Sequence, residues 1–138
     1  MAYLDTSVII AAITLEPRTA DVQQWLANNA NLYISSWVLT EVASALSIKL
    51  RTGAITLGER AASMAHWQRL QEQNVTLLPI DRAHFETAAI FAAQHDLGLR
   101  AGDAPHLAIA AAHGLAVATL DQAMAAAAPA LGIPVQPL

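Results

Sequence analysis

Short apolar runs alternate with longer helical patterns along this 138-residue chain, and this alternation limits the fold more than any other feature. The runs lie at residues 2–5, 32–34, 75–78 and 115–118, with a fifth, edge strand expected at 133–135, where a proline is tolerated. Strands that alternate with helices are typical of a parallel sheet covered on both faces. We therefore expect an α/β three-layer sandwich, with a mostly parallel central sheet of four to five strands.

Capping residues mark where the intervening helices begin. Thr56 and Glu59 have the spacing of a capping box. Ser36, Asp81 and Asp103 are expected to cap three further helices through their side chains. The helices are predicted over residues 8–13, 18–28, 36–52, 56–73, 81–95 and 104–113, with a last one after residue 121.

The composition excludes several classes of protein. The chain is 55% hydrophobic and 13% charged, which disfavours disorder. No apolar run reaches the ~18 residues that a membrane-spanning helix needs, and the N-terminus lacks the basic region of a signal peptide. There is no cysteine, so disulfides, thiolate metal sites and cysteine nucleophiles are excluded. We expect one domain over residues 1–138, in the cytoplasm and without a membrane partner.

The charge balance limits how the chain can bind nucleic acid. The formal net charge is −4, whereas proteins that hold nucleic acid by charge alone are usually basic. Lysine and arginine together number seven, against eleven acids. A nucleic-acid substrate would therefore be held locally, by a few arginines and by metal.

Four acids lie where predicted strands pass into helices or within the first turns of a helix: Asp5, Glu41, Asp103 and Asp121. The carboxyl ends of parallel strands share one edge of a sheet, so we expect these side chains to converge there. Hydrolysis of a phosphodiester needs an activated water and neutralised phosphoryl charge, and Mg²⁺ or Mn²⁺ supplies both. Such cations take oxygen ligands. The pattern predicts a divalent metal site that cuts RNA.

Each acid also has a purely structural alternative. Asp5, Asp103 and Asp121 stand where a helix N-cap is expected, and Asp is favoured at N-caps. Glu41 differs because it lies inside a helix among apolar neighbours, where a charge is usually paired or ligating. The four acids together are more specific than any one of them.

The segments that carry these acids share a recognisable pattern. They are Leu4–Ser7, Leu39–Val42, residues 99–103 followed by 106–110, and Thr119–Asp121. In this order the chain resembles the PIN-domain ribonucleases over essentially its whole length, and most of all the VapC toxins of type II toxin–antitoxin pairs. The resemblance implies a PIN-like sandwich and an endoribonuclease that depends on Mg²⁺ or Mn²⁺. It also implies targets such as tRNA or ribosomal RNA, cut in exposed single-stranded loops.

The same resemblance implies partners and roles. A small VapB-like antitoxin is expected to inhibit the protein by reaching into the acid pocket, and a homodimer is expected to form a heterotetramer or larger assembly with it. Asp5, Asp103 and Asp121 would mainly hold the metal or its waters. Glu41 would complete this catalytic quartet and help to activate the attacking water.

Five neighbouring residues bear on the site. By the resemblance, Thr6 and Thr119 fall on hydroxyl positions that line it. Arg100 is the best candidate for a phosphate contact, because a guanidinium grips phosphate at two points; its alternative is an ion pair within the acid cluster. Pro105 replaces an expected aliphatic residue and removes one backbone donor near the pocket. His106 is expected to pack in its helix or to bind a carboxylate rather than to touch substrate.

Three other classes of protein are alternatives to the nuclease. A PIN fold kept only as a binding module predicts the loss of one or more acids, and all four are present. A phospho-accepting receiver domain needs an acid pair beside the first strand and a lysine after the last. Here Thr6 and Ser7 follow Asp5, and the one lysine, Lys49, lies in mid-helix. A phosphatase of the HAD type would need Asp at position 7, which is Ser.

Overall fold

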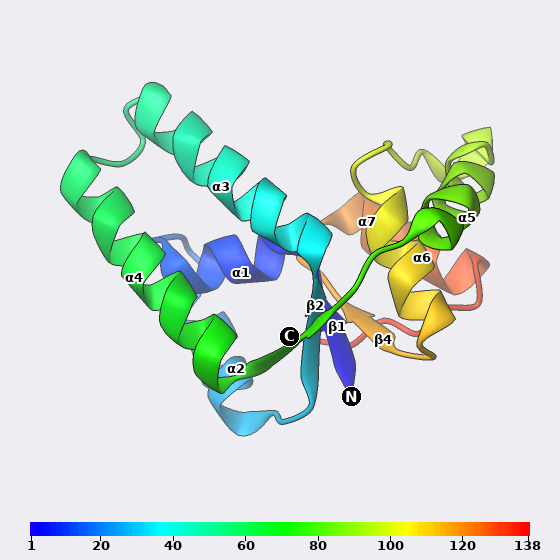
Figure 1. Ribbon diagram of the computed structural model, residues 1–138, viewed down its shortest axis with the longest axis horizontal. Coiled ribbons are helices and arrows are strands. Elements are labelled where there is room, and N and C mark those ends of the chain that lie inside the picture. Colours follow the sequence, from blue (N-terminus) through cyan, green and yellow to red (C-terminus); the bar gives the residue numbers. More distant parts are fainter.

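The computed structural model describes residues 1–138 and contains a four-stranded sheet with helices on both faces (Figure 1). The strands are β1 (Ala2–Leu4), β2 (Leu32–Ser35), β3 (Val75–Leu78) and β4 (Ala116–Ala118). Their spatial order is β3-β2-β1-β4, and each neighbouring pair is parallel. The predicted α/β architecture with a parallel central sheet is therefore confirmed.

The helices follow the predicted order, with small shifts at their ends. They are α1 (Thr6–Ile13), α2 (Thr19–Asn28), α3 (Ser36–Arg51), α4 (Leu57–Gln73), α5 (Arg82–Ala92), α6 (Ala104–Ala112) and α7 (Gln122–Ala130), with a 3₁₀ turn at His95–Leu97. Helices α1 to α4 lie on one side of the sheet and α5 to α7 on the other (Figure 1). Two helical layers thus enclose the strands.

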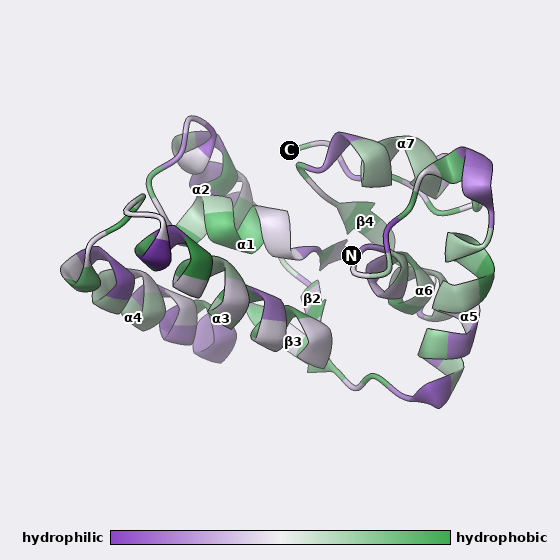
Figure 2. Cartoon of the chain, turned by 90° about the horizontal axis from the view of Figure 1, so that it is seen from above, coloured by the Kyte–Doolittle hydropathy of each residue, from purple (hydrophilic) through white to green (hydrophobic).

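The central strand β1 divides the core between the two layers. Successive side chains of a strand point to opposite faces. Ala2 and Leu4 accordingly join the apolar core that is shared with α1 to α4, whereas Tyr3 joins the core formed with β4, α6 and α7. Helices α1 and α6 are largely hydrophobic, whereas the outer helix α4 is mixed (Figure 2). None of the helices combines the length and hydrophobicity that crossing a membrane would require.

The capping predictions were partly right. Thr56 forms its capping box, and Asp81 caps α5 through its side chain. Ser36 is the first residue of α3 and not its cap; Ser35 takes that position but makes no capping bond. Asp103 precedes α6 without a capping side-chain bond. The hydroxyl of Ser35 and the carboxylate of Asp103 are thus free for other contacts.

The expected fifth, edge strand is shorter than a regular strand. Residues 133–135 are reduced to an isolated parallel bridge between Val117 and Val135. The backbone N–H of Val117 donates to Pro134 O over 2.8 Å, and that of Gln136 donates to Val117 O over 2.8 Å. Pro134 has no N–H to continue the ladder.

Candidate active site

The carboxyl ends of β1 and β4 lie side by side and bring two acidic segments together. The backbone N–H of Asp5, just after β1, donates to Ala118 O at the end of β4 over 3.1 Å. The chain beyond β4 therefore carries Thr119 and Asp121 to the edge that Asp5 occupies. This is the convergence that the strand–acid pattern predicted.

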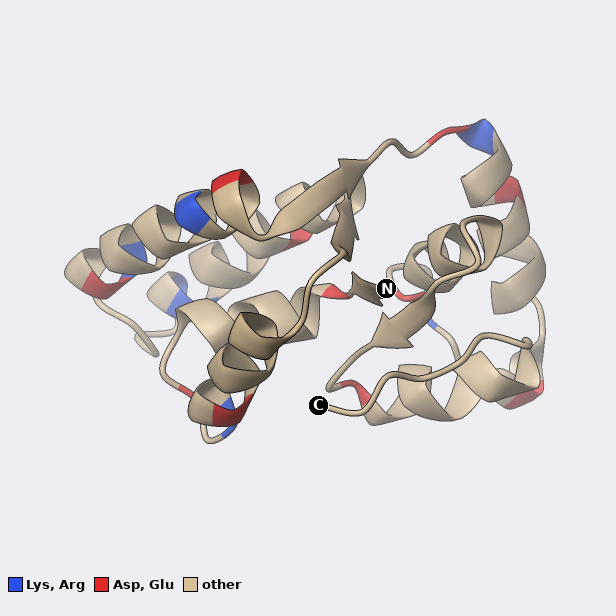
Figure 3. Ribbon diagram, turned by 90° about the horizontal axis from the view of Figure 1, so that it is seen from below, with Lys and Arg blue, Asp and Glu red and all other residues tan.

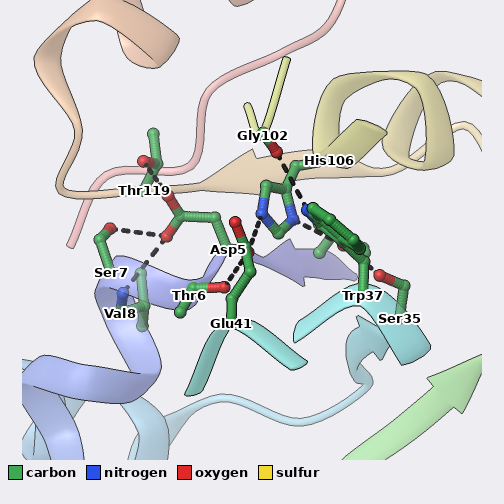
Figure 4. Close-up of polar contacts among 11 residues, drawn as sticks. Asp5, Thr6, Ser7, Val8, Ser35, Trp37, Glu41, Gly102, His106 and Thr119 are labelled. Atoms are coloured by element: carbon green, nitrogen blue, oxygen red, sulfur yellow. Dashed lines mark hydrogen bonds and ion pairs between the residues drawn. The ribbon is translucent and has the colours of Figure 1, made fainter. Parts of the chain in front are cut away.

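Both oxygens of the Asp5 carboxylate are held by hydrogen bonds (Figure 4). Oδ1 accepts from the hydroxyl of Ser7 over 2.6 Å and from the backbone N–H of Val8 over 3.2 Å. Oδ2 accepts from the hydroxyl of Thr119 over 2.7 Å. The residue is only 3% exposed. Burial raises the pKa of Asp5 above its usual value, although the bonds from Ser7 and Thr119 oppose that shift.

The same hydroxyls also bind the backbone of the loop after β4. Ser7 Oγ accepts from the N–H of Leu120 over 2.8 Å, and Thr119 Oγ1 accepts from the N–H of Asp121 over 2.9 Å. Asp121 Oδ1 then accepts from the N–H of Met124 over 2.8 Å and caps α7. Asp5, Ser7, Thr119 and Asp121 with these bonds form what we call the Asp5 network. The sequence pattern did not reveal the bridging role of Ser7.

Glu41 reaches the same edge from α3. The hydroxyl of Thr6 donates to its Oε2, and His106 Nε2 lies 2.6 Å from that same oxygen (Figure 4). Burial alone raises the pKa of Glu41, but the contacts with His106 and Thr6 outweigh it, and the pKa lies below its usual value. Oε1 faces the backbone of Gly102, where an added Cβ would lie 3.5 Å away.

His106 is buried behind Glu41 and uses both ring nitrogens. It is 2% exposed. Its Nδ1 lies 2.9 Å from the hydroxyl of Tyr3, and that hydroxyl lies 2.7 Å from Ser35 Oγ. Burial raises the pKa of Tyr3, so its hydroxyl stays neutral. The prediction that His106 binds a carboxylate is confirmed. Nothing in the sequence indicated the contacts of Tyr3 and Ser35.

Asp103 approaches from the loop before α6. The indole N–H of Trp37, in α3, donates to Gly102 O over 3.1 Å and so ties this loop to the helix that carries Glu41. Burial raises the pKa of Asp103, and the negative charge of Asp121, with a smaller contribution from Glu41, raises it further. The structure therefore brings all four predicted acids into one region.

The donor set in this region suits a hard cation. All four acids offer carboxylate oxygens, which Mg²⁺ and Mn²⁺ prefer. The only donor near the Asp103 carboxylate is the backbone of Arg100, so most of its lone pairs are free. As the side chains stand, no three acids or histidines surround one point closely enough to hold an ion. The chemistry of the residues fits a divalent cation, provided that the carboxylates close around it.

The three residues predicted to line the site differ in their contacts. Thr6 and Thr119 each donate to one of the acids, Glu41 and Asp5. Arg100 is exposed, and no acid forms an ion pair with it. The alternative of an ion pair within the acid cluster is therefore wrong for Arg100. The positions of lysine and arginine are spread over several elements of the ribbon (Figure 3).

Comparison with known proteins identifies the family. Residues 2–129 match the family model of the PIN domain. The chain belongs to the PIN domain family. This PIN domain has no match among curated protein sequences.

Three solved structures illustrate the similarity in fold. They are VapC20, a Sarcin-Ricin loop cleaving toxin from Mycobacterium tuberculosis (22% identity, 92% of this chain and 95% of that chain, TM-score 0.71), FitAcB from Neisseria gonorrhoeae (22%, 99% and 97%, 0.70) and a toxin–antitoxin complex from Klebsiella pneumoniae (19%, 88% and 87%, 0.61). At these identities the similarity establishes the fold. The resemblance read from the sequence is confirmed for family and fold.

Proposed function

We propose that this PIN domain is a metal-dependent endoribonuclease and acts as the toxin of a VapC-type toxin–antitoxin pair. One observation carries the proposal: Asp5, Glu41, Asp103 and Asp121 share one edge of the sheet, where burial and then the negative charges of Asp121 and Glu41 raise the pKa of Asp103. Such a cluster is best explained by a cation that neutralises it. The similar fold of VapC20, described as a Sarcin-Ricin loop cleaving toxin, supports RNA as the substrate.

Asp5, Asp103 and Asp121 would hold the cation, Mg²⁺ or Mn²⁺, with Glu41 completing the site. When bound, the cation supplies an activated water and neutralises phosphoryl charge. The Asp5 network fixes the carboxylate of Asp5 and the backbone of Asp121 in advance, because both are held by hydroxyls. Preorganisation of this kind lowers the cost of reaching the reactive geometry.

Glu41 is suited to receive a proton from the attacking water. Its pKa lies below the usual value, so it is ionised at neutral pH. Oε2 is engaged by Thr6 and His106, whereas Oε1 faces the Gly102 side of the site. A base must lie within hydrogen-bond reach of the proton that it takes, and Oε1 is the oxygen placed for that contact. Arg100, exposed beside Asp103, is proposed to contact a substrate phosphate.

We further propose an inhibitory antitoxin partner, a homodimer and a cytoplasmic location. The complex from Klebsiella pneumoniae, described as toxin–antitoxin, supports the partner. Exposed apolar side chains on α4 and α5 offer surfaces for such assembly, among them Leu57, Met64, Phe85 and Ile90. Cross-linking within the purified complex would show which surface contacts the antitoxin and which contacts the second protomer.

The direct test is cleavage of total cellular RNA by the purified protein with Mg²⁺ or Mn²⁺ and with EDTA. We expect discrete, EDTA-sensitive products that are absent with Asp5→Asn. Asp96→Asn, an exposed acid seven positions before Asp103, is the matched control and should cleave like the wild type. If the folded protein, freed of any inhibitor, cuts no RNA, a binding module becomes the better explanation of the fold.

A further inference from the structure

A buried polar chain runs from β2 to Glu41 through the core. Ser35 Oγ lies 2.7 Å from the hydroxyl of Tyr3, which lies 2.9 Å from His106 Nδ1, and His106 Nε2 lies 2.6 Å from Glu41 Oε2. These residues come from the end of β2, from β1, from α6 and from α3. Tyr3 is fully buried. This series of hydrogen bonds thus connects elements that lie far apart in the sequence.

Such a chain has a cost that packing alone would not justify. A buried polar group loses its hydrogen bonds to water and is tolerated only when a partner replaces them. Every buried side-chain nitrogen and oxygen in the protein has such a partner. Apolar residues of the same shape at Tyr3 and His106 would avoid the requirement altogether. Stability alone therefore does not require polar groups at these positions.

The direction of the hydrogen bonds shows what the chain holds. The carboxylate of Glu41 only accepts, so His106 Nε2 must donate to Oε2. When the imidazole is neutral, the Tyr3 hydroxyl donates to Nδ1 and accepts from Ser35; when it is protonated, Nδ1 donates to Tyr3, which donates to Ser35, and in both cases Nε2 donates to Glu41. With Oε2 taken by His106 and Thr6, Glu41 cannot rotate freely, and Oε1 is left on the side of Gly102 and the Trp37 indole, next to the loop that leads to Asp103.

We propose that Tyr3 and His106 are positioning residues that fix Glu41 with Oε1 turned to the reacting water. The proposal rests on the nuclease function above. Ser35 completes the chain by holding the Tyr3 hydroxyl. Neither Tyr3 nor His106 needs to touch substrate, because each acts through Glu41. Outer partners that orient a functional group typically change affinity or activity by about 10–100-fold when removed.

The structure supplies a matched pair of variants for the test. Tyr3 and Tyr33 are register partners on neighbouring strands, but the Tyr33 hydroxyl meets only Met1 Sδ at the surface. Both Tyr3→Phe and Tyr33→Phe therefore remove one hydroxyl, but only Tyr3→Phe removes it from the buried hydrogen-bond series. For Tyr3→Phe we expect kcat to fall about tenfold with KM for RNA nearly unchanged. Tyr33→Phe should match the wild type, and equal kcat in both variants would overturn the proposal.

A second pair tests the donor to Glu41. His106→Gln can still present an N–H toward Oε2, whereas His106→Leu cannot. We expect the Gln variant to keep at least about tenfold more activity than the Leu variant. Equal loss in two folded variants would mean that the histidine serves packing alone.

A readout without catalysis separates this proposal from the nuclease function. In metal-free protein labelled with ¹⁵N-histidine, NMR should show a hydrogen-bonded proton on His106 Nε2. That signal should persist in Tyr33→Phe and shift in Tyr3→Phe. An Nε2 without a proton, or a signal untouched by Tyr3→Phe, would refute the chain. If the spectra agree but no variant cuts RNA, the proposed function fails while the geometry stands.

Discussion

The two halves of the acid cluster are built differently. In the Asp5 network, both oxygens of Asp5 accept from protein donors, and the loop to Asp121 is fastened by the hydroxyls of Ser7 and Thr119. At Asp103 the carboxylate makes no capping bond, and burial together with the negative charges of Asp121 and Glu41 raises its pKa. One half is satisfied by the protein, and the other is left with free oxygens and uncompensated charge.

The difference indicates a division of labour. Carboxylates that accept several hydrogen bonds are held rigidly in one orientation. A carboxylate with few donors keeps its lone pairs for an external partner, and the repulsion around it is relieved when a cation binds. We therefore assign orientation to the Asp5 half and the strongest dependence on metal to Asp103. The following predictions test this assignment.

The largest expected effect follows from Asp103→Asn. The change removes the charge that is least compensated by protein, so cleavage should fall by about a thousandfold, the equivalent of several kcal/mol of lost charge stabilisation. Single-turnover cleavage of a defined RNA measures it. Asp96→Asn is the control. A fall of only a few fold would show that Asp103 is not part of the metal site.

In the absence of metal, Asp103→Asn should be more stable than the wild type at neutral pH. Because the pKa of Asp103 is raised in the folded state, the protonated form contributes stability at pH below the unfolded-state pKa. That contribution is lost as pH rises through the folded-state pKa. Relative to wild type, metal-free Asp103→Asn should therefore gain melting temperature as pH rises from 4 to 7. A difference that is constant over this range would contradict the raised pKa of Asp103.

Glu41→Gln should keep the fold and lose activity. The amide oxygen can still accept from Thr6 and His106, so the melting temperature should barely change. Loss of the proton-accepting oxygen should lower kcat by about a hundredfold. Circular dichroism melting and single-turnover rates give the two readouts. Unchanged cleavage together with unchanged Mn²⁺ binding would remove Glu41 from the site.

Thr119→Val should destabilise the Asp5 network. The isosteric change removes the donor to Asp5 Oδ2 and the acceptor for the N–H of Asp121. We expect a loss of about 1–3 kcal/mol in the free energy of unfolding, as for other buried bonds, and about tenfold in activity. Thr14→Val is the matched control, because the Thr14 hydroxyl donates to Ile10 O at the C-terminal end of α1; this variant should lose stability but not activity.

The smallest effect is expected for Arg100→Ala. The side chain is exposed, so a contact with a substrate phosphate is worth little and is screened by salt. KM for RNA should rise about threefold at low salt, with kcat unchanged. Arg82→Ala, an exposed arginine at the start of α5, is the control. A change in kcat instead of KM would place Arg100 in the chemistry.

Local patterns in the sequence were sufficient for the sheet and for the acids. Alternating apolar runs and helical periods predicted the parallel strands, and acids after those runs predicted the shared edge. The fifth strand is reduced to one bridge, between Val117 and Val135, because Pro134 has no N–H to extend the hydrogen bonds with β4. Each of these features depends on residues that are close together in the chain.

The partners of the acids could not be predicted in the same way. Thr119 binds Asp5, and Tyr3 binds His106, across more than a hundred residues. Such bonds depend on side-chain placement after packing, which no spacing rule encodes. Asp103 looked like a helix cap because Asp favours that position, yet it makes no capping bond in the structure. Whether a hydroxyl caps, bridges or lines a site is fixed only in three dimensions.

The most direct measurement is a calorimetric titration of metal-stripped protein with Mn²⁺, in the wild type, Asp103→Asn and Asp96→Asn. We expect the wild type and Asp96→Asn to bind alike, and Asp103→Asn to bind at least about tenfold more weakly. Equal binding by all three proteins, or no binding by the wild type, would contradict the central claim that these acids form a divalent metal site.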